Sequence, residues 1–112
     1  DTYARFQKDI STISRDVKRK LKNNKMIAFG AAAKGIVALH SLGLDPECIV
    51  DENPLKIGKI LPKKMIPIVG TDILKEYPED LDIIILAWNF KSEISRKIKD
   101  IRGDRDNLIC IF

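Results

Sequence analysis

Residues 25–35 read K-M-I-A-F-G-A-A-A-K-G, and this stretch decides the fold that we expect. The apolar run at residues 26–29 is typical of a short buried parallel strand, and it stops at Gly30. Small residues follow, and a helical pattern begins at about residue 32 and continues to residue 42. A strand, a tight turn of small residues and a helix make half of a nucleotide-binding βαβ unit, in which amides at the helix start hold phosphates.

The remainder of the chain alternates between strand and helix patterns. We predict further strands at residues 48–50, 66–69, 81–88 and 108–112, and further helices at residues 72–76 and 92–102. Residues 83–86, I-I-I-L, show no polar alternation, which indicates a strand buried on both faces. The sequence therefore predicts one α/β domain over residues 1–112, with a Rossmann-like, open, mainly parallel five-stranded sheet and helices on both faces.

Turn and capping residues indicate where the predicted elements end. Gly43 lies just past the helix that begins near residue 32 and is a candidate C-cap. Thr71 and Asn89 precede the next two predicted helices and are candidate N-caps. The Lys-rich connection at residues 55–65 has no strong period, so we expect a long loop there with at most a short extended piece.

The N-terminal residues 1–24 carry one apolar stripe. Apolar side chains recur there at spacings of three and four: Tyr3, Phe6, Ile10, Ile13, Val17 and Leu21. This spacing predicts an amphipathic helix of about six turns that ends at Asn23-Asn24 and packs on the sheet. A helix that docks a partner protein is the alternative, although the repeat is too short to favour a coiled coil.

The composition excludes several classes of protein. A hydrophobic content of 45% and a charged content of 32% are those of a globular chain, not of a disordered one. No apolar run reaches the roughly 18 residues of a membrane helix, and no signal peptide opens the chain, so we expect a cytoplasmic protein without membrane contacts. The chain begins at Asp1 without an initiator Met, and we therefore expect a fragment or a trimmed chain.

Charge, cysteine and histidine content narrow the function further. The net charge of +4 is concentrated at residues 15–25 and 56–64 and favours anionic partners, with a solvated Lys-rich surface as the alternative. We find no zinc-finger spacing, RNA-binding aromatic signature or helix-turn-helix, so we expect no nucleic acid partner. Cys48 and Cys110 fall in separate predicted strands and are expected to be free, buried thiols. With His40 as the one histidine and no metal-ligand spacing, catalysis by this chain alone has little support.

The glycine-rich turn carries the first group of candidate ligand-binding residues. Against the dinucleotide fingerprint G-x-G-x-x-G/A, Gly30 takes the second glycine position and Ala33 takes the last. Asp51 follows about 20 residues later, at the end of the second predicted strand, where the fingerprint has a ribose-binding acid. Lys34 lies in the first helical turn, where a nearby phosphate would favour a cation. A doubly wound sheet whose turns are merely tight is the alternative, with Lys34 exposed to solvent.

Two further stretches follow strands that end at the same edge of the predicted sheet. The loop after Asp51 could place Asn53, Lys56 and Lys59 beside a ligand, although surface positions are the alternative for the lysines. The run Trp88-Asn89-Phe90 could supply aromatic rings that stack on a base or sugar and an amide that hydrogen-bonds to it. The alternative role for Trp88 is to close the core.

Together these stretches resemble the C-terminal domain of sugar C-methyltransferases, the S-adenosylmethionine-dependent enzymes that methylate nucleotide-linked deoxysugars. The G-Y-G-A-A-A-K-G turn of that family is matched by residues 28–35, with Ala28 and Phe29 in place of Gly and Tyr. Its V-D-x-N-P-x-K-x-G-x-x-x-P stretch is matched by residues 50–62, its I-P-I by residues 66–68 and its W-N-F by residues 88–90. The order and spacing of the motifs agree over nearly the whole chain.

The resemblance implies a Rossmann-like domain that helps to hold a nucleotide-linked sugar against an upstream methyltransferase domain. In the family, an N-terminal zinc-binding domain and a central domain with the S-adenosylmethionine site and the catalytic base precede this one. The chain would then be a substrate-side piece with no cofactor or metal of its own and no catalytic residue. The residues expected to bind substrate are Gly30, Ala31, Ala32, Ala33, Lys34, Gly35, Asp51, Asn53, Lys56, Trp88, Asn89 and Phe90.

Two other functions remain open at this point. The first is a dinucleotide- or coenzyme A-binding regulatory domain of a sugar-modifying oxidoreductase or acetyltransferase, since such proteins share a D-x-N-P-x-K-x-G-type loop after the second strand. The second is a structural module that docks a partner through its amphipathic first helix.

Overall fold

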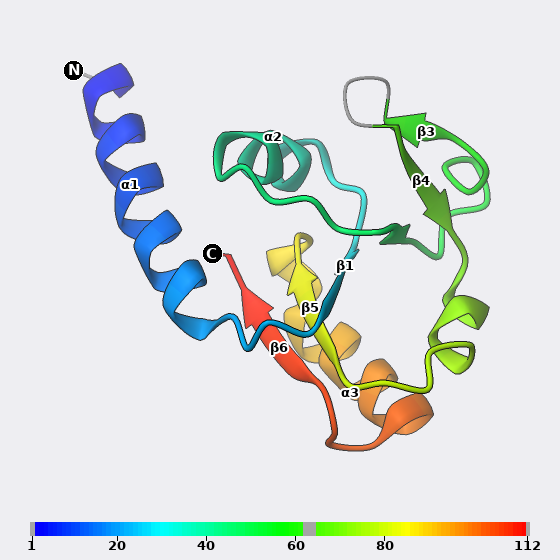
Figure 1. Ribbon diagram of the computed structural model, residues 1–112. Coiled ribbons are helices and arrows are strands. Elements are labelled where there is room, and N and C mark those ends of the chain that lie inside the picture. Colours follow the sequence, from blue (N-terminus) through cyan, green and yellow to red (C-terminus); the bar gives the residue numbers. More distant parts are fainter. Residues whose placement is uncertain (1, 62–64, 112) are drawn as a thin grey trace.

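The computed structural model describes residues 2–61 and 65–111 of the chain (Figure 1). It is a mixed α/β fold that contains, within these ranges, three α-helices, two 3-10 segments and six strands. The elements in chain order are α1 (Thr2–Lys20), β1 (Lys25–Phe29), α2 (Ala33–Ser41), β2 (Ile49–Val50), β3 (Ile60–Leu61), β4 (Ile66–Val69), η1 (Thr71–Lys75), β5 (Leu81–Ile85), η2 (Trp88–Phe90), α3 (Lys91–Arg102) and β6 (Asn107–Cys110).

The sheet has the order β3-β4-β2-β1-β5-β6. Every neighbouring pair is parallel except β3 and β4, which are antiparallel. The five parallel strands therefore follow the order 3-2-1-4-5 of a doubly wound sheet. The chain builds outward from β1 in one direction and then returns to build outward from β5 in the other. The boundary between β1 and β5 is consequently the topological switch point, where such sheets bind ligands at the carboxyl ends of the strands.

All five predicted strands are present in the structure, but the predicted total of five is wrong because the sheet has a sixth strand. The sixth strand, β3, lies in the connection that we predicted as a loop with a short extended piece, and it pairs Ile60 with Pro67 and Leu61 with Ile66. A two-residue strand is too short to show a period, which explains why the pattern missed it. The predicted strand at residues 81–88 was too long, since β5 ends at Ile85 and residues 88–90 form η2.

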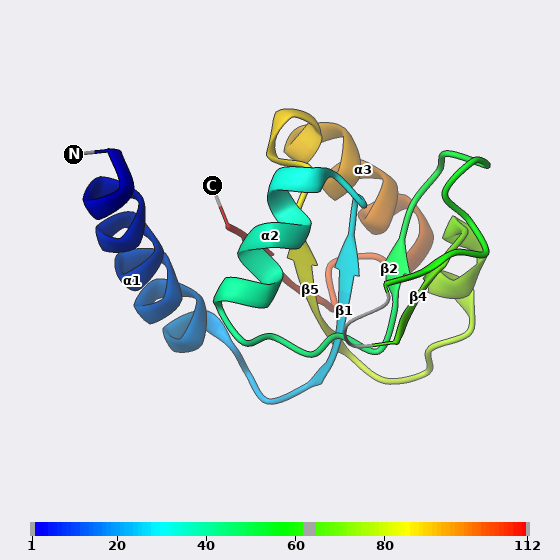
Figure 2. The ribbon, with the colours of Figure 1, turned by 90° about the horizontal axis from the view of Figure 1, so that it is seen from above.

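Two hydrophobic clusters lie on opposite faces of the sheet. Ala38 and Leu39 of α2 pack with Ile84 on one face, while Ile94 and Ile98 of α3 belong to the cluster on the other face. Figure 2 shows α2 and α3 on either side of the strands. All five residues of β5 are buried, in agreement with the expectation of a strand covered on both faces. Val37 of α2 is 53% exposed, so it lies on the helix face that is turned away from the sheet.

The N-terminal helix ends at Lys20, earlier than the predicted end at Asn23-Asn24. The buried Asp82 carboxylate explains this early end, because it accepts hydrogen bonds from the backbone amides of Lys22 (3.0 Å) and Asn24 (3.3 Å). Packing on the sheet is seen at the C-terminal part of α1, where Val17 is 2% exposed. The N-terminal turns of α1 stand apart from the sheet in both views (Figures 1 and 2).

Helix caps were predicted with mixed success. The C-cap of α2 is Leu42, and Gly43, the predicted cap, follows one position later with φ +68° and donates its amide to the His40 carbonyl. The segment after β4 is a 3-10 helix with Gly70 as its N-cap, so Thr71 is not the cap that we predicted. Phe90, not Asn89, is the N-cap of α3.

The length and hydropathy of the helices show whether any of them could span a membrane. Among residues 2–61 and 65–111, no helix is both long enough and apolar enough to cross a membrane.

Candidate functional site

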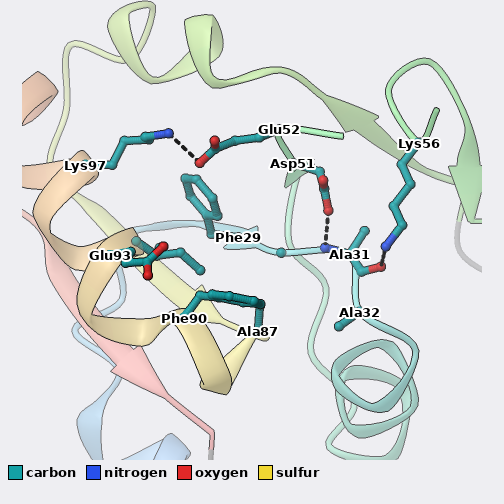
Figure 3. A pocket seen from close by; sticks show the side chains of 12 residues that line it. Phe29, Ala31, Ala32, Asp51, Glu52, Lys56, Ala87, Phe90, Glu93 and Lys97 are labelled. Atoms are coloured by element: carbon teal, nitrogen blue, oxygen red, sulfur yellow. Dashed lines mark hydrogen bonds and ion pairs between the residues drawn. The ribbon is translucent and has the colours of Figure 1, made fainter. Parts of the chain in front are cut away.

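The main candidate site is a cavity of about 430 Å³ at the carboxyl edge of the sheet, at the switch point between β1 and β5 (Figure 3). Its walls come from the ends of β1 and β2, the turn before α2, the loop after β2, the segment after β5, and α3. The lining residues are Phe29, Gly30, Ala31, Ala32, Asp51, Glu52, Lys56, Ala87, Phe90, Glu93, Ile94 and Lys97. Six of the twelve residues predicted to bind substrate are among them: Gly30, Ala31, Ala32, Asp51, Lys56 and Phe90.

Gly30 makes the turn at the end of β1 sterically feasible. Its φ of +94° is a conformation that other residues rarely adopt, and an added Cβ would lie 2.6 Å from the Cβ of Ala87. Its amide donates to the Val50 carbonyl at 2.7 Å. The glycine therefore allows the ends of β1 and β5 to approach closely at the floor of the cavity.

The Asp51 carboxylate is engaged in hydrogen bonds within the protein and is not free to bind a ligand. Its Oδ2 accepts a hydrogen bond from the Ala31 amide at 2.7 Å, and its Oδ1 accepts one from the Asn53 amide at 2.7 Å. The Ala32 amide donates to the Gly30 carbonyl at 2.9 Å. The amides of Gly30, Ala31 and Ala32 are thus all engaged in internal hydrogen bonds. At the Ala31 amide, the Asp51 carboxylate takes the place that we expected a ligand phosphate to occupy.

Lys56 joins the loop after β2 to the glycine turn. Its Nζ donates to the Ala31 carbonyl at 2.8 Å, and the side chain lines the cavity. The loop is bent by Asn53, whose Oδ1 accepts a hydrogen bond from the Leu55 amide at 3.0 Å. Asn53 itself is exposed and does not line the cavity, so its role in the structure is to shape the loop that carries Lys56.

Two predicted residues at the start of α2 lie outside the cavity lining, Lys34 and Gly35, and the side chain of Ala33 is outside the part of the chain that the structure describes. Gly35 is buried against the segment after β5, where an added Cβ would lie 2.5 Å from the Leu86 Cβ and 2.8 Å from the Leu86 carbonyl oxygen. Gly35 therefore permits close packing between helix and sheet, the role of the last glycine in dinucleotide-binding turns. Lys34 is exposed.

The aromatic run after β5 contributes one described ring to the cavity. Phe90 is 55% exposed, and its amide donates to the Ala87 carbonyl at 3.0 Å within η2. Asn89 is exposed and does not line the cavity. The backbone of Trp88 lies in η2, and its side chain is outside the part of the chain that the structure describes.

Three charged residues of the cavity were not predicted from the sequence: Glu52, Glu93 and Lys97. Lys97 of α3 pairs with Glu52 at 2.5 Å, and this ion pair crosses from α3 to the end of β2 (Figure 3). A signal for them was present, because Glu52 follows Asp51 directly, and Glu93 and Lys97 are spaced i, i+4 in the helix after the aromatic run. The cavity lining therefore has three carboxylates and two ammonium groups.

A second cavity of about 430 Å³ surrounds Tyr77, toward the amino ends of the strands. Its polar groups bind one another, because the Tyr77 hydroxyl donates to Glu47 at 2.7 Å and Lys25 lies 3.5 Å from Glu79. Burial raises the pKa of Tyr77 well above its usual range, and its hydrogen bonds with Glu47 and Cys48 raise it further. Burial likewise raises the pKa of the Cys48 thiol. The Tyr77 hydroxyl and the Lys25 ammonium group are thus already engaged with carboxylates of the protein, which makes the cavity at the switch point the better candidate for ligand binding.

The two cysteines are both free thiols. Cys48 is buried as predicted, whereas Cys110 is only partly buried because it lies at the end of the edge strand β6. In the part of the chain that the structure describes, no group of three or more His, Cys, Asp or Glu side chains could hold a metal ion.

The strand order, the glycine turn and the cavity at the switch point define a domain of the doubly wound α/β class. Within that class, the family model of the C-methyltransferase C-terminal domain matches residues 1–112, and the chain belongs to this family. No curated protein matches the chain. Family membership confirms the resemblance that the motifs indicated and makes this a methyltransferase-associated domain.

Proposed function

We propose that the cavity at the switch point binds the nucleotide-linked sugar substrate of an S-adenosylmethionine-dependent C-methyltransferase. The observation that carries the proposal is a cavity of about 430 Å³ at the carboxyl edge between β1 and β5, in a chain of the C-methyltransferase C-terminal domain family. In this proposal the methyl donor, the zinc ion and the catalytic base belong to other domains of the enzyme. The present domain positions the substrate and does not catalyse methyl transfer by itself.

The size and lining of the cavity support binding of part of a nucleotide sugar. Ligand sites typically enclose about 300–1,000 Å³ and combine apolar walls with a few polar groups. Here Phe29, Ala87 and Ile94 provide apolar wall, and the half-exposed Phe90 ring offers a surface on which a base or a sugar can stack. Charged groups on the rim provide the polar contacts.

The internal hydrogen bonds of the glycine turn change where the diphosphate is expected to lie. The amides of Gly30, Ala31 and Ala32 already donate to internal acceptors, so a phosphate that used them would have to displace those acceptors. Lys56 uses one donor on the Ala31 carbonyl, and an ammonium group has two more donors to offer. We therefore place the diphosphate near Lys56 in the proposal, and not on the amides of the turn.

The same hydrogen bonds bear on the alternative function as a dinucleotide- or coenzyme A-binding domain. Dinucleotide sites hold the pyrophosphate on free amides at the start of the helix. In this chain the Asp51 carboxylate occupies the Ala31 amide at 2.7 Å, and a second anion there would be repelled. We accordingly expect NAD and coenzyme A to bind more weakly than a nucleoside diphosphate sugar.

Isothermal titration of the chain with UDP-glucose, dTDP-glucose, GDP-mannose, NAD and coenzyme A tests the proposal. We expect at least one of the sugar nucleotides to bind more tightly than NAD or coenzyme A. Lys56→Met should weaken that binding by about tenfold, since a charge-assisted hydrogen bond contributes about 1.5–3 kcal/mol. Lys56→Arg should retain most of the affinity because it keeps the charge.

Lys59→Met is the matched control for the loss of charge. Lys59 is an exposed lysine three residues further along the same loop, and it does not line the cavity. Its replacement should leave the affinity unchanged. Equal losses at both lysines would show that only the general positive charge of the loop matters, and tighter binding of NAD than of every sugar nucleotide would contradict the proposal.

A further inference from the structure

We infer that Glu93 recognises the uncharged, hydrogen-bond-donating end of the ligand and so determines the direction in which the ligand lies. This inference rests on the proposed function and goes further by assigning a specificity-determining residue and the class of group that it accepts. That group is a sugar hydroxyl or a base N–H, and not a phosphate.

The first observation is that Glu93 is the one uncommitted carboxylate among the three that line the cavity. Both oxygens of Asp51 accept backbone amides, and Glu52 pairs with Lys97 at 2.5 Å. Within residues 2–61 and 65–111, no hydrogen bond or ion pair engages the side chain of Glu93, which is exposed. Its carboxylate is therefore available to a ligand.

The second observation is the chemistry of an ionised carboxylate, which only accepts hydrogen bonds. A ligand group that satisfies Glu93 must donate, as a hydroxyl or a ring N–H does. A phosphate next to Glu93 would instead be repelled by that carboxylate, whereas the charge of the neighbouring Glu52 is balanced by Lys97 at 2.5 Å. The part of the cavity next to Glu93 thus favours an uncharged polar group over a phosphate.

The third observation is the arrangement of Glu93 relative to Phe90 and Lys56. Glu93 belongs to the first turn of α3, directly after Phe90, whose ring is 55% exposed. Figure 3 shows Glu93 and Phe90 on the α3 side of the cavity and Lys56 on the side of the glycine turn. A ligand with its phosphates near Lys56 would then place its polar ring against Phe90 and its donors on Glu93.

An alternative role for Glu93 is purely structural, because an acidic residue in the first turn of a helix interacts favourably with the helix dipole. That role would affect the stability of the chain and leave ligand selectivity unchanged. Ligand affinity therefore distinguishes the two roles when Glu93 is replaced by a neutral residue. Weaker binding would indicate that Glu93 accepts a hydrogen bond from the ligand, and tighter binding would indicate that a phosphate lies beside it.

The experiment is a titration of wild-type chain, Glu93→Gln and the control Asp100→Asn with UDP-glucose, dTDP-glucose and GDP-mannose and with the matching nucleoside diphosphates. Asp100 is an exposed carboxylate of the same helix that does not line the cavity. We expect Glu93→Gln to weaken binding of the preferred sugar nucleotide by about tenfold and Asp100→Asn to leave it unchanged. Weakening confined to the sugar-bearing ligand identifies sugar hydroxyls as the donors, and equal weakening for the nucleoside diphosphate identifies the nucleoside.

Two results would overturn the inference alone. Unchanged affinity in Glu93→Gln would leave only the structural role, and tighter binding would place a phosphate beside the carboxylate. In both cases wild-type binding would still support the proposed function. Absence of binding by the wild-type chain to every sugar nucleotide would overturn the proposed function and this inference together.

Discussion

Replacing Gly35 by alanine should destabilise the domain, although alanine is normally favoured over glycine inside a helix by about 1 kcal/mol. An added Cβ would lie 2.5 Å from the Cβ, 2.8 Å from the carbonyl oxygen and 3.1 Å from the carbonyl carbon of Leu86. Leu86 is completely buried, so its backbone has little room to move. Overpacking of this kind costs about 1–3 kcal/mol. Taking the upper end, because the contacts are with backbone atoms, the net loss is about 2 kcal/mol.

Urea unfolding of Gly35→Ala and of the control Gly70→Ala measures this loss. At Gly70 the φ is −79°, and an added Cβ would meet only the flexible end of Ile57 at 3.6 Å. Alanine there should stabilise the chain by about 0.5 kcal/mol through the unfolded state. The melting temperature of Gly35→Ala should fall by roughly 8 °C. A neutral or stabilising effect of Gly35→Ala would refute the close packing of α2 on the segment after β5.

Three other changes test the packing around the sheet. Arg102→Met should cost about 3–5 kcal/mol in urea unfolding, because the buried guanidinium pairs with the buried Asp106 carboxylate at 2.6 Å and would leave it unpaired. Asp82→Ala should speed amide hydrogen exchange in α1 and in the following linker by about tenfold or more, because Asp82 holds two linker amides. The raised pKa of Tyr77 means that the folded chain keeps a proton that the unfolded chain releases near pH 10. Stability should therefore fall as pH rises through that range, and Tyr77→Phe should flatten the dependence measured by urea unfolding at several pH values.

The fold was largely predictable because its signals are local and repeated. The apolar run Ile83–Leu86, which has no polar alternation, indicated a central buried strand. The alternation of strands with helices indicated that the carboxyl ends of the strands lie at one edge of the sheet. The early end of α1 was not predictable, since it depends on Asp82, a residue some 60 positions away in sequence. β3 was missed because its two residues are defined by pairing with β4 and not by a period of their own.

The candidate site was predicted in part. The residues directly after strands were found because their position at the carboxyl edge follows from topology alone, as for Gly30 and Asp51. Whether an amide at that edge is free depends on tertiary hydrogen bonds, and the bond from the Ala31 amide to Asp51 is not visible in the sequence. Glu93 and Lys97 were not predicted because they lie on a helix, α3, and the topology of the sheet places only the residues that follow strands at the carboxyl edge.

The central claim is that the cavity between the glycine turn and α3 holds a nucleotide-linked sugar. The most direct measurement is mapping of amide chemical shifts in the labelled chain during titration with the sugar nucleotide that binds best. We expect the largest shifts at residues that line the cavity, namely Gly30, Ala31, Lys56, Phe90 and Glu93. Largest shifts around the Tyr77 cavity or along α1, or no shifts at millimolar ligand, would contradict it.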